Sequence, residues 1–318
     1  MDGLSPAGYI GPVVQSLAQA LRAYRIIAES EGKSRRTLEW VEASAGSLQD
    51  FLGDGVALEN ITTQDLRRWI LALRQRRRWP GRPEFKAAGS LSATSINNYV
   101  RGVKLLLATL AREGLIGPHP AAQLKAPPPA RLTIKPYTEP ELRRIFKALG
   151  ETDNPLRNRA LAGLMLDPGL RLGEAVGITL PTLDLEGRSL LVKGKGDKER
   201  LLPLGAWTAK LLLLYMARER PRVDSPHLFL EADGTPLSAR AVQEVFRRLT
   251  RRLGIRVHAH RFRHTGSIEY LRSGGDSLYL QQLLGHADLA MTKRYCDIAG
   301  VDLKQAHKKF SPGDRLRL

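Results

Sequence analysis

Four short stretches in the second half of the chain hold polar residues of types that carry out chemistry. They are DPGLRLGEA (167–175), KGKGDKER (193–200), HAHRFRHTG (258–266) and LLGHADLAMTKRYCD (283–297). The side chains that stand out in them are Arg171, Lys195, His260, Arg263, His286 and Tyr295. A tyrosine hydroxyl can act as a covalent nucleophile, and arginine forks can clamp anionic oxygens.

Each of these residues also has a structural explanation when it is taken alone. Arg171 can pair with Glu174 one helix turn away, Lys195 can be an ordinary turn lysine, and His286 can cap a helix. Tyr295 can be a half-buried aromatic side chain whose hydroxyl lies at the surface. Residue type alone therefore leaves the choice between structure and chemistry open.

The elements that must position these residues are mainly helices. Helical spacing of apolar residues and stop signals predict helices over 139–149, 158–166, 206–218, 238–253, 261–273, 277–284, 289–295 and 303–309. The run SLLVKGKGDKERLLPL predicts a β-hairpin with Lys195 at its tip, because two apolar runs flank a glycine-rich turn. Arg171 follows a Pro-Gly break, which predicts that it stands at the start of a helix.

The first third also reads as helices. They are predicted over 13–31 and 34–52, from a cap at Thr63 or Thr62 through Leu73, and from Ser92 or Thr94 through Ala111, with a loop at 76–90. The proline-rich segment 118–136 cannot hold a helix and predicts a semi-rigid spacer. We therefore predict a helical domain at 1–117, a linker at 118–136 and a second domain at 137–318.

The charge of the chain points to a polyanionic partner. Fifty Lys and Arg against 32 Asp and Glu leave a formal net charge of +18 over 318 residues, which favours nucleic acid before membrane. Residues 61–112 carry eleven Lys and Arg but two acids, which predicts contact with DNA phosphates. The candidate DNA-binding residues are Arg74, Arg76, Arg77, Arg78, Arg101 and Lys104.

Other sequence features narrow the class of protein. No apolar run approaches the ~20 residues of a membrane-spanning helix, and the first residues lack the build of a signal peptide. The one cysteine, Cys296, excludes a disulfide framework and a cysteine zinc cluster. These features predict a protein of the cytoplasm with no membrane partner.

Taken together, the chemical residues resemble the catalytic set of the tyrosine recombinase (phage integrase) family, in order and spacing. The motifs are G-L-R-x-x-E at 169–174, G-K-G at the hairpin, H-x-x-R-H-T at 260–265, L-G-H at 284–286 and the pair Arg294-Tyr295. The hairpin and the closing motifs look most like the Xer-type bacterial branch. The chain departs from the family pattern at Pro168, where threonine is common, and at Gly173, where serine is common.

The resemblance implies a fold and a role for each residue. The fold is mainly α with a small antiparallel β-sheet: a helical core-binding (SAM-like) N-terminal domain and a mixed α/β catalytic domain. Tyr295 is the nucleophile, Arg171 and Arg263 clamp the phosphate, and Lys195 is the general acid to the departing 5′ oxygen. His260 and His286 position the phosphate and assist proton movement, and Glu174 orients Arg171 by ion pairing.

Competing readings of the same residues are weaker. His260 and His264 stand four apart like helical zinc ligands, but HRFRH lacks the glutamate of H-E-x-x-H and has cationic neighbours. The hairpin lacks the G-x-x-x-x-G-K-[ST] pattern of a nucleotide loop. We therefore predict no metal and no cofactor. His227, His258 and His264 are interpreted as structural or peripheral, and Cys296 as a small packing residue.

The sequence thus predicts a site-specific DNA recombinase or integrase that acts through a 3′-phosphotyrosyl intermediate and a Holliday junction. By resemblance it clamps double-stranded DNA between its two domains and works as a homotetramer; any directionality factor is unknown. Two alternatives remain: a type IB topoisomerase-like relaxing enzyme, and a non-catalytic DNA-binding accessory protein. The intact set of six residues argues against the accessory protein.

Overall fold

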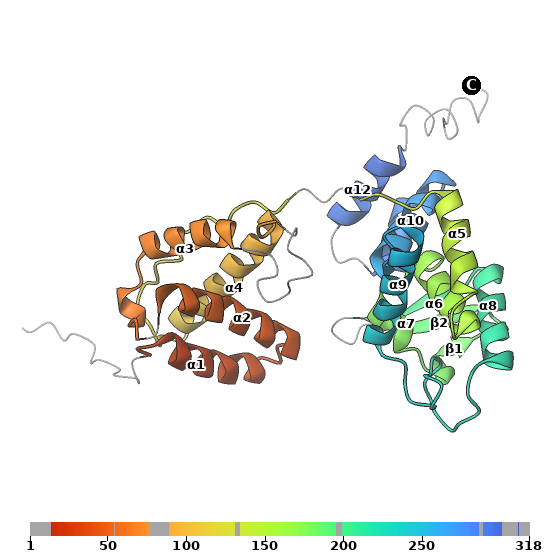
Figure 1. Ribbon diagram of the computed structural model, residues 1–318, viewed down its shortest axis with the longest axis horizontal. Coiled ribbons are helices and arrows are strands. Elements are labelled where there is room, and N and C mark those ends of the chain that lie inside the picture. Colours follow the sequence, from red (N-terminus) through yellow and green to blue (C-terminus); the bar gives the residue numbers. More distant parts are fainter. Residues whose placement is uncertain are drawn as a thin grey trace, which may run out of the picture. The chain divides into compact units, whose positions relative to one another are not determined.

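The protein is described here by a computed structural model, which covers residues 14–53, 55–76, 89–130, 134–194, 199–285, 289–300 and 311. The chain divides into two compact units, Met1–Leu132 and Thr133–Leu318 (Figure 1). Within the predicted linker, Ala121 and Leu124 belong to the core of unit 1, and Ile134 packs in a small cluster of unit 2. The domain limits at 117 and 137 stay a prediction.

In its described residues, unit 1 is a bundle of four helices with one 3₁₀ turn, Leu58–Asn60. The helices are α1 (Leu17–Ser30), α2 (Arg35–Leu52), α3 (Thr63–Gln75) and α4 (Ala93–Arg112). Each helix turns its apolar stripe inward, so that Trp69, Leu48 and Leu106 are fully buried in one core. Thr62 rather than Thr63 caps α3, and Ser92 rather than Thr94 caps α4.

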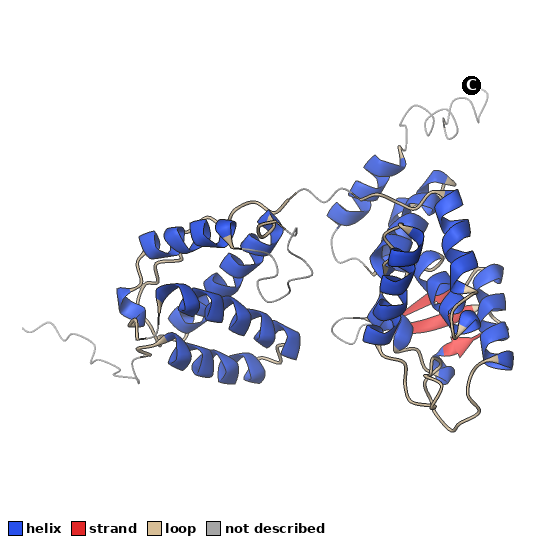
Figure 2. Cartoon of the chain, in the orientation of Figure 1, coloured by secondary structure: helices blue, strands red, loops and turns tan. Residues whose placement is uncertain are grey.

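Unit 2 holds eight α-helices among its described residues. They are α5 (Glu139–Leu149), α6 (Pro155–Leu166), α7 (Leu172–Val176), α8 (Ala206–Arg218), α9 (Ala239–Leu253), α10 (Ala259–Arg272), α11 (Ser277–Leu284) and α12 (Leu289–Ala299). Figure 2 colours the helices blue and the strands of the sheet red. A short 3₁₀ turn, Leu180–Thr182, leads into the sheet. The fold class predicted from the sequence is confirmed, because helices surround one small antiparallel sheet. The predicted helix at 303–309 lies outside the described residues.

The sheet has three antiparallel strands, in the order β1 (Leu183–Asp184), β2 (Ser189–Lys193) and β3 (Glu199–Pro203). The predicted hairpin is β2 with β3, and Leu190 lies opposite Leu202 in a pair that faces the core. Strand β1 was not predicted, since two residues are too few to show alternation. The connection between β2 and β3, residues 195–198, lies outside the described residues.

Two features of unit 2 position the candidate site. Helix α10 packs against α6 and α12. At Gly266, an added Cβ would lie 1.7 Å from the carbonyl oxygen of Leu166, so only glycine allows α10 to approach α6 this closely. In the described part of the chain, no helix has the length and apolar character needed to cross a bilayer.

Candidate active site

Helix α10 carries the centre of the site. His258 caps its start, because the His258 ring accepts a hydrogen bond from the backbone N–H of Arg261 at 3.3 Å. Spacings of three and four residues then place His260, Arg263, His264 and Ser267 on one face of the helix. One helix therefore presents two imidazoles, a guanidinium and a hydroxyl on the same side.

Arg263 ties this face to two neighbouring segments. Its side chain is 3% exposed and donates hydrogen bonds to the carbonyl of Gly169 and, at 2.8 Å, to that of Leu284. Gly169 has a φ of +70° and begins the turn that leads to Arg171. Leu284 ends α11, two residues before His286. The same guanidinium thus holds both the Arg171 turn and the end of α11 against α10.

Arg171 stands at the N-cap of α7, as the Pro-Gly break predicted. The expected ion pair with Glu174 is confirmed, because Arg171 Nη1 lies 2.8 Å from Glu174 Oε1. The Arg171 backbone N–H also donates to Glu174 Oε2 at 2.9 Å. The Arg171 side chain is 40% exposed and remains accessible to a ligand. A Cβ at Gly173 would meet nothing within 4 Å, so this departure from the family pattern leaves the turn undisturbed.

Glu174 has a second partner that the sequence did not indicate. Arg200 of β3 places its Nη2 2.9 Å from Glu174 Oε2, and its Nε donates to the carbonyl of Leu283 at 3.2 Å. The Glu174 side chain is only 9% exposed. Burial alone would raise the pKa of Glu174, but hydrogen bonds from Arg200 and Arg171 outweigh it and lower the pKa. Arg200 therefore joins the hairpin, α7 and α11 through one carboxylate.

Tyr295 lies on α12 with 0% of its surface exposed. Its hydroxyl and His264 Nδ1 are 2.8 Å apart, and the two ring centroids are 5.6 Å apart. Burial raises the pKa of the Tyr295 phenol, while the charge of Arg263 and hydrogen bonds with Ser267 and Arg263 act in the opposite direction. The phenol oxygen therefore lies at the hydrogen-bonding face of α10, inside the protein.

Like charges gather around this oxygen. Desolvation and, after it, the nearby charge of Arg171 lower the pKa of Arg263 to about 10. The residue His260 is exposed, yet the atoms around its ring desolvate it and lower its pKa, with added effects from Arg263 and Arg171. Cations that raise the energy of one another's charged forms form a surface suited to binding an anion.

The structure thus brings together four of the six predicted site residues: Arg171, His260, Arg263 and Tyr295. The other two, Lys195 and His286, lie outside the described residues. Gly285 ends α11 with a φ of +61°, and a Cβ there would lie 3.2 Å from Arg200 Nη1.

His264, interpreted as structural or peripheral, is not peripheral, since its ring bonds the tyrosine hydroxyl. His260, His264 and Ser267 follow a helical spacing, and this pattern could have placed His264 on the site face. Arg200 gave no such signal, because its contact with Glu174 depends on the packing of the hairpin against α7. His258 is structural as interpreted, and Cys296 packs partly buried beside the Tyr295 cluster.

The candidate DNA-binding residues have different surroundings in unit 1. Arg74 and Arg101 are exposed on α3 and α4. Arg76 is also exposed, and its Nη1 donates to the Ser47 hydroxyl at 3.1 Å. Lys104 donates to the carbonyl of Leu124 at 2.6 Å, a contact within the bundle. Arg77 and Arg78 lie outside the described residues. DNA contact by all six stays a prediction.

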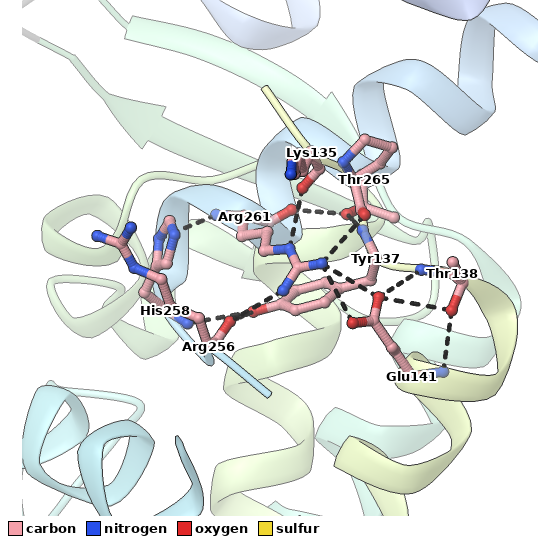
Figure 3. Close-up of polar contacts among 9 residues, drawn as sticks. Lys135, Tyr137, Thr138, Glu141, Arg256, His258, Arg261 and Thr265 are labelled. Carbon is pink, nitrogen blue, oxygen red and sulfur yellow. Dashed lines mark hydrogen bonds and ion pairs between the residues drawn. The ribbon is translucent and has the colours of Figure 1, made fainter. Parts of the chain in front are cut away.

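A separate cluster anchors the entry into unit 2 to α10 (Figure 3). The Arg261 guanidinium lies 4.1 Å from the ring centroid of Tyr137, donates to the carbonyl of Lys135 at 2.9 Å and pairs with Glu141 at 3.1 Å. The backbone N–H of Tyr137 donates to the Thr265 hydroxyl at 2.8 Å. Arg261 and Thr265 lie on a different face of α10 from His260 and Arg263, because each residue turns the helix by about 100°.

No group of three or more His, Cys, Asp or Glu side chains able to hold a metal ion occurs in the part of the chain that the structure describes. The two histidines of the zinc alternative, His260 and His264, have ring centroids 6.1 Å apart. His264 Nδ1 is engaged with Tyr295. Within the described residues, the site is one of cations, imidazoles and a phenol.

Residues 136–300 match the family described as the Phage integrase family. Among curated relatives, tyrosine recombinase XerD of Mycobacterium tuberculosis is 33% identical over 250 residues, which cover 75% of this chain and 78% of the relative. Tyrosine recombinase XerC of Xylella fastidiosa is 32% identical over 291 residues, which cover 89% of this chain and 93% of the relative.

Solved structures share the fold. The Tn1549 transposon integrase, in complex with a circular intermediate DNA, aligns with a TM-score of 0.71 at 18% identity and covers 88% of this chain and 94% of its own. A lambda integrase dimer bound to a COC′ core site aligns with a TM-score of 0.69 at 20% identity, over 90% of this chain and 78% of its own.

Proposed function

Because the chain belongs to the phage integrase family, we propose that it is a site-specific DNA recombinase of the tyrosine type. Its relatives XerC and XerD are tyrosine recombinases. The observation that carries the proposal is the position of Tyr295, whose hydroxyl meets the face of α10 that holds His260 and Arg263. A phenol, two guanidiniums and imidazoles in one place suit covalent transfer of a phosphodiester.

In the proposed cleavage step, the Tyr295 oxygen attacks the phosphorus of one strand. A bond forms between that oxygen and phosphorus, the bond to the 5′ oxygen breaks, and the phenol loses its proton to a base in the site. We assign Lys195 as the acid that gives the leaving 5′ oxygen its proton. The DNA is then held through a 3′-phosphotyrosyl bond, which keeps the energy of the phosphodiester for rejoining.

Arg171 and Arg263 are proposed to bind the non-bridging oxygens of that phosphate. The half-exposed Arg171 can reach a ligand, and Glu174 fixes its orientation. A phosphate between the two guanidiniums offsets their mutual repulsion, and the negative charge that grows in the transition state offsets it further. His260 is assigned to position the phosphate, together with His286.

The recombinase reading fits better than the two alternatives. An accessory protein that only binds DNA would have no use for a tyrosine beside paired arginines and an imidazole. A type IB topoisomerase-like enzyme would share the chemistry, but the relatives XerD and XerC are recombinases. Exchange between two duplexes further requires a Holliday junction and several protomers, and we propose a homotetramer on DNA.

Unit 1 is proposed to supply much of the affinity for double-stranded DNA. It has a groove of about 530 Å³ between α3 and the segment 123–128, lined by apolar residues and by three cations, Arg67, Arg74 and Lys125. Cations along a groove suit a phosphate backbone. Arg76, Arg77, Arg78, Arg101 and Lys104 are proposed as further contacts. A chromosomal substrate would place the protein in the compartment that holds the chromosome, the cytoplasm of a prokaryote.

The test is covalent capture. A target duplex, selected from a random-sequence library by binding to the full chain, is nicked just 3′ of the scissile phosphate so that a short fragment diffuses away after cleavage. We expect the protein to become joined to a DNA 3′ end through the peptide that contains Tyr295, with no metal or ATP supplied. An adduct on another residue, or a 5′ linkage, overturns the assignment.

A further inference from the structure

The structure identifies a base for the proton that Tyr295 must lose. Among the described residues, three side chains bond the phenol oxygen: His264, whose Nδ1 is 2.8 Å away, and Ser267 and Arg263, whose hydrogen bonds lower the phenol pKa. A guanidinium carries its proton at neutral pH and cannot accept another. The Ser267 hydroxyl donates to the carbonyl of Arg263 at 2.8 Å, and a neutral hydroxyl is no base. Of these three, only the imidazole can take the proton.

We propose that His264 is a catalytic residue, whose Nδ1 accepts the Tyr295 proton during strand cleavage and returns it during rejoining. The inference rests on the proposed function. The phenol O–H bond breaks as the oxygen–phosphorus bond forms, and the proton moves to Nδ1, which can accept it when the neutral ring carries its own hydrogen on Nε2. In rejoining, the 5′ hydroxyl attacks the phosphorus and returns its proton to Lys195, the bond between phosphorus and the tyrosine oxygen breaks, and the imidazolium gives its proton back to that oxygen.

The surroundings of His264 favour reversible protonation of its ring over a stable imidazolium. His260 lies one turn away on α10, with ring centroids 6.1 Å apart at an interplanar angle of 30°. Arg263 and Arg171 already lower the pKa of that neighbouring imidazole. An imidazolium in the same cationic face is therefore raised in energy, which favours return of the proton once the tyrosine oxygen leaves. Arg263, close to the phenol oxygen, stabilises the negative charge that develops on it.

The first arm of the test is His264→Asn in single-turnover cleavage of the nicked target duplex. The asparagine side-chain oxygen lies near the place of Nδ1 and accepts a hydrogen bond, but an amide does not take up a proton at neutral pH. We expect cleavage to slow by about 10²–10⁴-fold, the usual effect of a lost general base, with DNA affinity unchanged.

His258→Asn is the matched control. It makes the same replacement on the same helix, where His258 serves as the N-cap and asparagine is a good cap. We expect wild-type cleavage from this variant. His264→Gln is measured alongside, since it tests whether a second neutral amide behaves in the same way.

The second arm replaces Tyr295 with a fluorotyrosine, whose phenol is more acidic than that of tyrosine. A more acidic phenol needs less help to ionise, so we expect it to restore most of the cleavage rate of His264→Asn while changing the wild-type rate little. A residue that merely holds the ring in place would show no such rescue. This arm therefore separates a proton-transfer role from a structural one.

The outcomes are distinct. If the wild-type protein forms no adduct at Tyr295, the proposed function fails. If the wild type cleaves and His264→Asn cleaves equally fast, only the role of His264 is overturned. The role is also overturned if fluorotyrosine rescues neither amide variant that binds DNA. A slow His264→Asn that fluorotyrosine rescues supports the proposal.

Discussion

The hydroxyl of Tyr295 is the smallest unit on which the proposed reaction depends. Tyr295→Phe removes one oxygen and keeps a ring that is fully buried. We expect cleavage of the nicked duplex to vanish, because phenylalanine has no atom that can hold the phosphate. The free energy of unfolding should fall by about 1 kcal/mol, the usual worth of the lost hydrogen bond with His264. DNA affinity should stay at the wild-type level.

Tyr279→Phe serves as the control for this change. Tyr279 lies on α11 and is largely exposed, so its hydroxyl has no place in the proposed site. Normal cleavage by Tyr279→Phe and none by Tyr295→Phe would assign the reaction to one oxygen. Full cleavage by Tyr295→Phe would refute the nucleophile.

The lysine of the hairpin can be tested through the leaving group. We expect Lys195→Ala to cleave ordinary DNA more slowly by about 10²–10⁴-fold, as for a lost general acid. A substrate with sulfur in place of the bridging 5′ oxygen should restore most of the rate, because a thiolate leaves without a proton. Arg171→Ala and Arg263→Ala should gain nothing from sulfur, since their role is charge stabilisation. Absence of rescue in Lys195→Ala would move the acid role to Lys193 or Lys198.

The lowered pKa of His258, the N-cap of α10, predicts how the stability of unit 2 depends on pH. Desolvation lowers the pKa of His258 from 6.5 to about 4 in the folded chain. Between these values the unfolded chain binds more protons, so the stability of unit 2 decreases as the pH falls through this range. His258→Asn keeps the cap and removes the ionisation, so urea unfolding at several pH values should show a shallower decrease. The residue His260 contributes with the same sign and leaves part of the slope. Equal slopes in both proteins would contradict this assignment.

At the scale of elements, the sequence predicted the helices and strands that are long enough to show a periodic pattern of apolar residues. It did not predict a very short strand or an individual contact between side chains. Except for α7, of which the Pro-Gly break predicted only the start, the α-helices of the described residues were predicted from apolar spacing and capping signals. The β2–β3 hairpin was predicted from two apolar runs around a glycine-rich turn. The strand β1 and the Arg200–Glu174 pair were not, because a two-residue strand has no period and the pair joins residues 26 positions apart. Six site residues were named from motifs, and four of them lie among the described residues. Helical spacing could have placed His264 on the site face, but its hydrogen bond with Tyr295 depends on the contact between α10 and α12.

The ion pair between Arg200 of β3 and Glu174 of α7 predicts that its loss lowers both stability and the cleavage rate. Arg200→Met keeps the length of the side chain but leaves the buried Glu174 with Arg171 alone. We expect a loss of about 3 kcal/mol in the free energy of unfolding, as for a broken buried ion pair. Cleavage should slow as Arg171 is drawn toward the carboxylate, with DNA affinity little changed. Adding Glu174→Gln should recover stability but not cleavage.

The control is another arginine with a carboxylate partner. Arg247 pairs with Glu244 at 2.7 Å on the exposed face of α9. Such exposed pairs contribute about 0–1 kcal/mol, so Arg247→Met should change neither stability nor cleavage much. If the effects of Arg200→Met and Glu174→Gln simply add in the double variant, the two side chains are not coupled and the proposed link fails.

For the whole molecule, the net charge of +18 predicts DNA binding that weakens steeply with salt. We expect part of the phosphate contacts to lie in the groove of unit 1. Changing Arg67, Arg74 and Lys125 to glutamine should flatten the slope of log K against log salt by about one unit per lost phosphate contact. Arg35→Gln, which removes an exposed charge outside the groove, should leave the slope unchanged. An unchanged slope in the triple variant would show that these cations are only a solvated face.

The contact at Gly266 also sets a limit on how this protein can vary over generations. A side chain there would collide with the backbone of α6 and push α10 outward, carrying His260, Arg263 and His264 with it. The DNA-binding face proposed for unit 1 can change one arginine at a time, and a new target sequence can be acquired that way. The contact of Gly266 with the backbone of α6 cannot change in small steps, because even a methyl side chain would collide there. A lineage can change what the enzyme recognises far more easily than it can change how close these two helices lie.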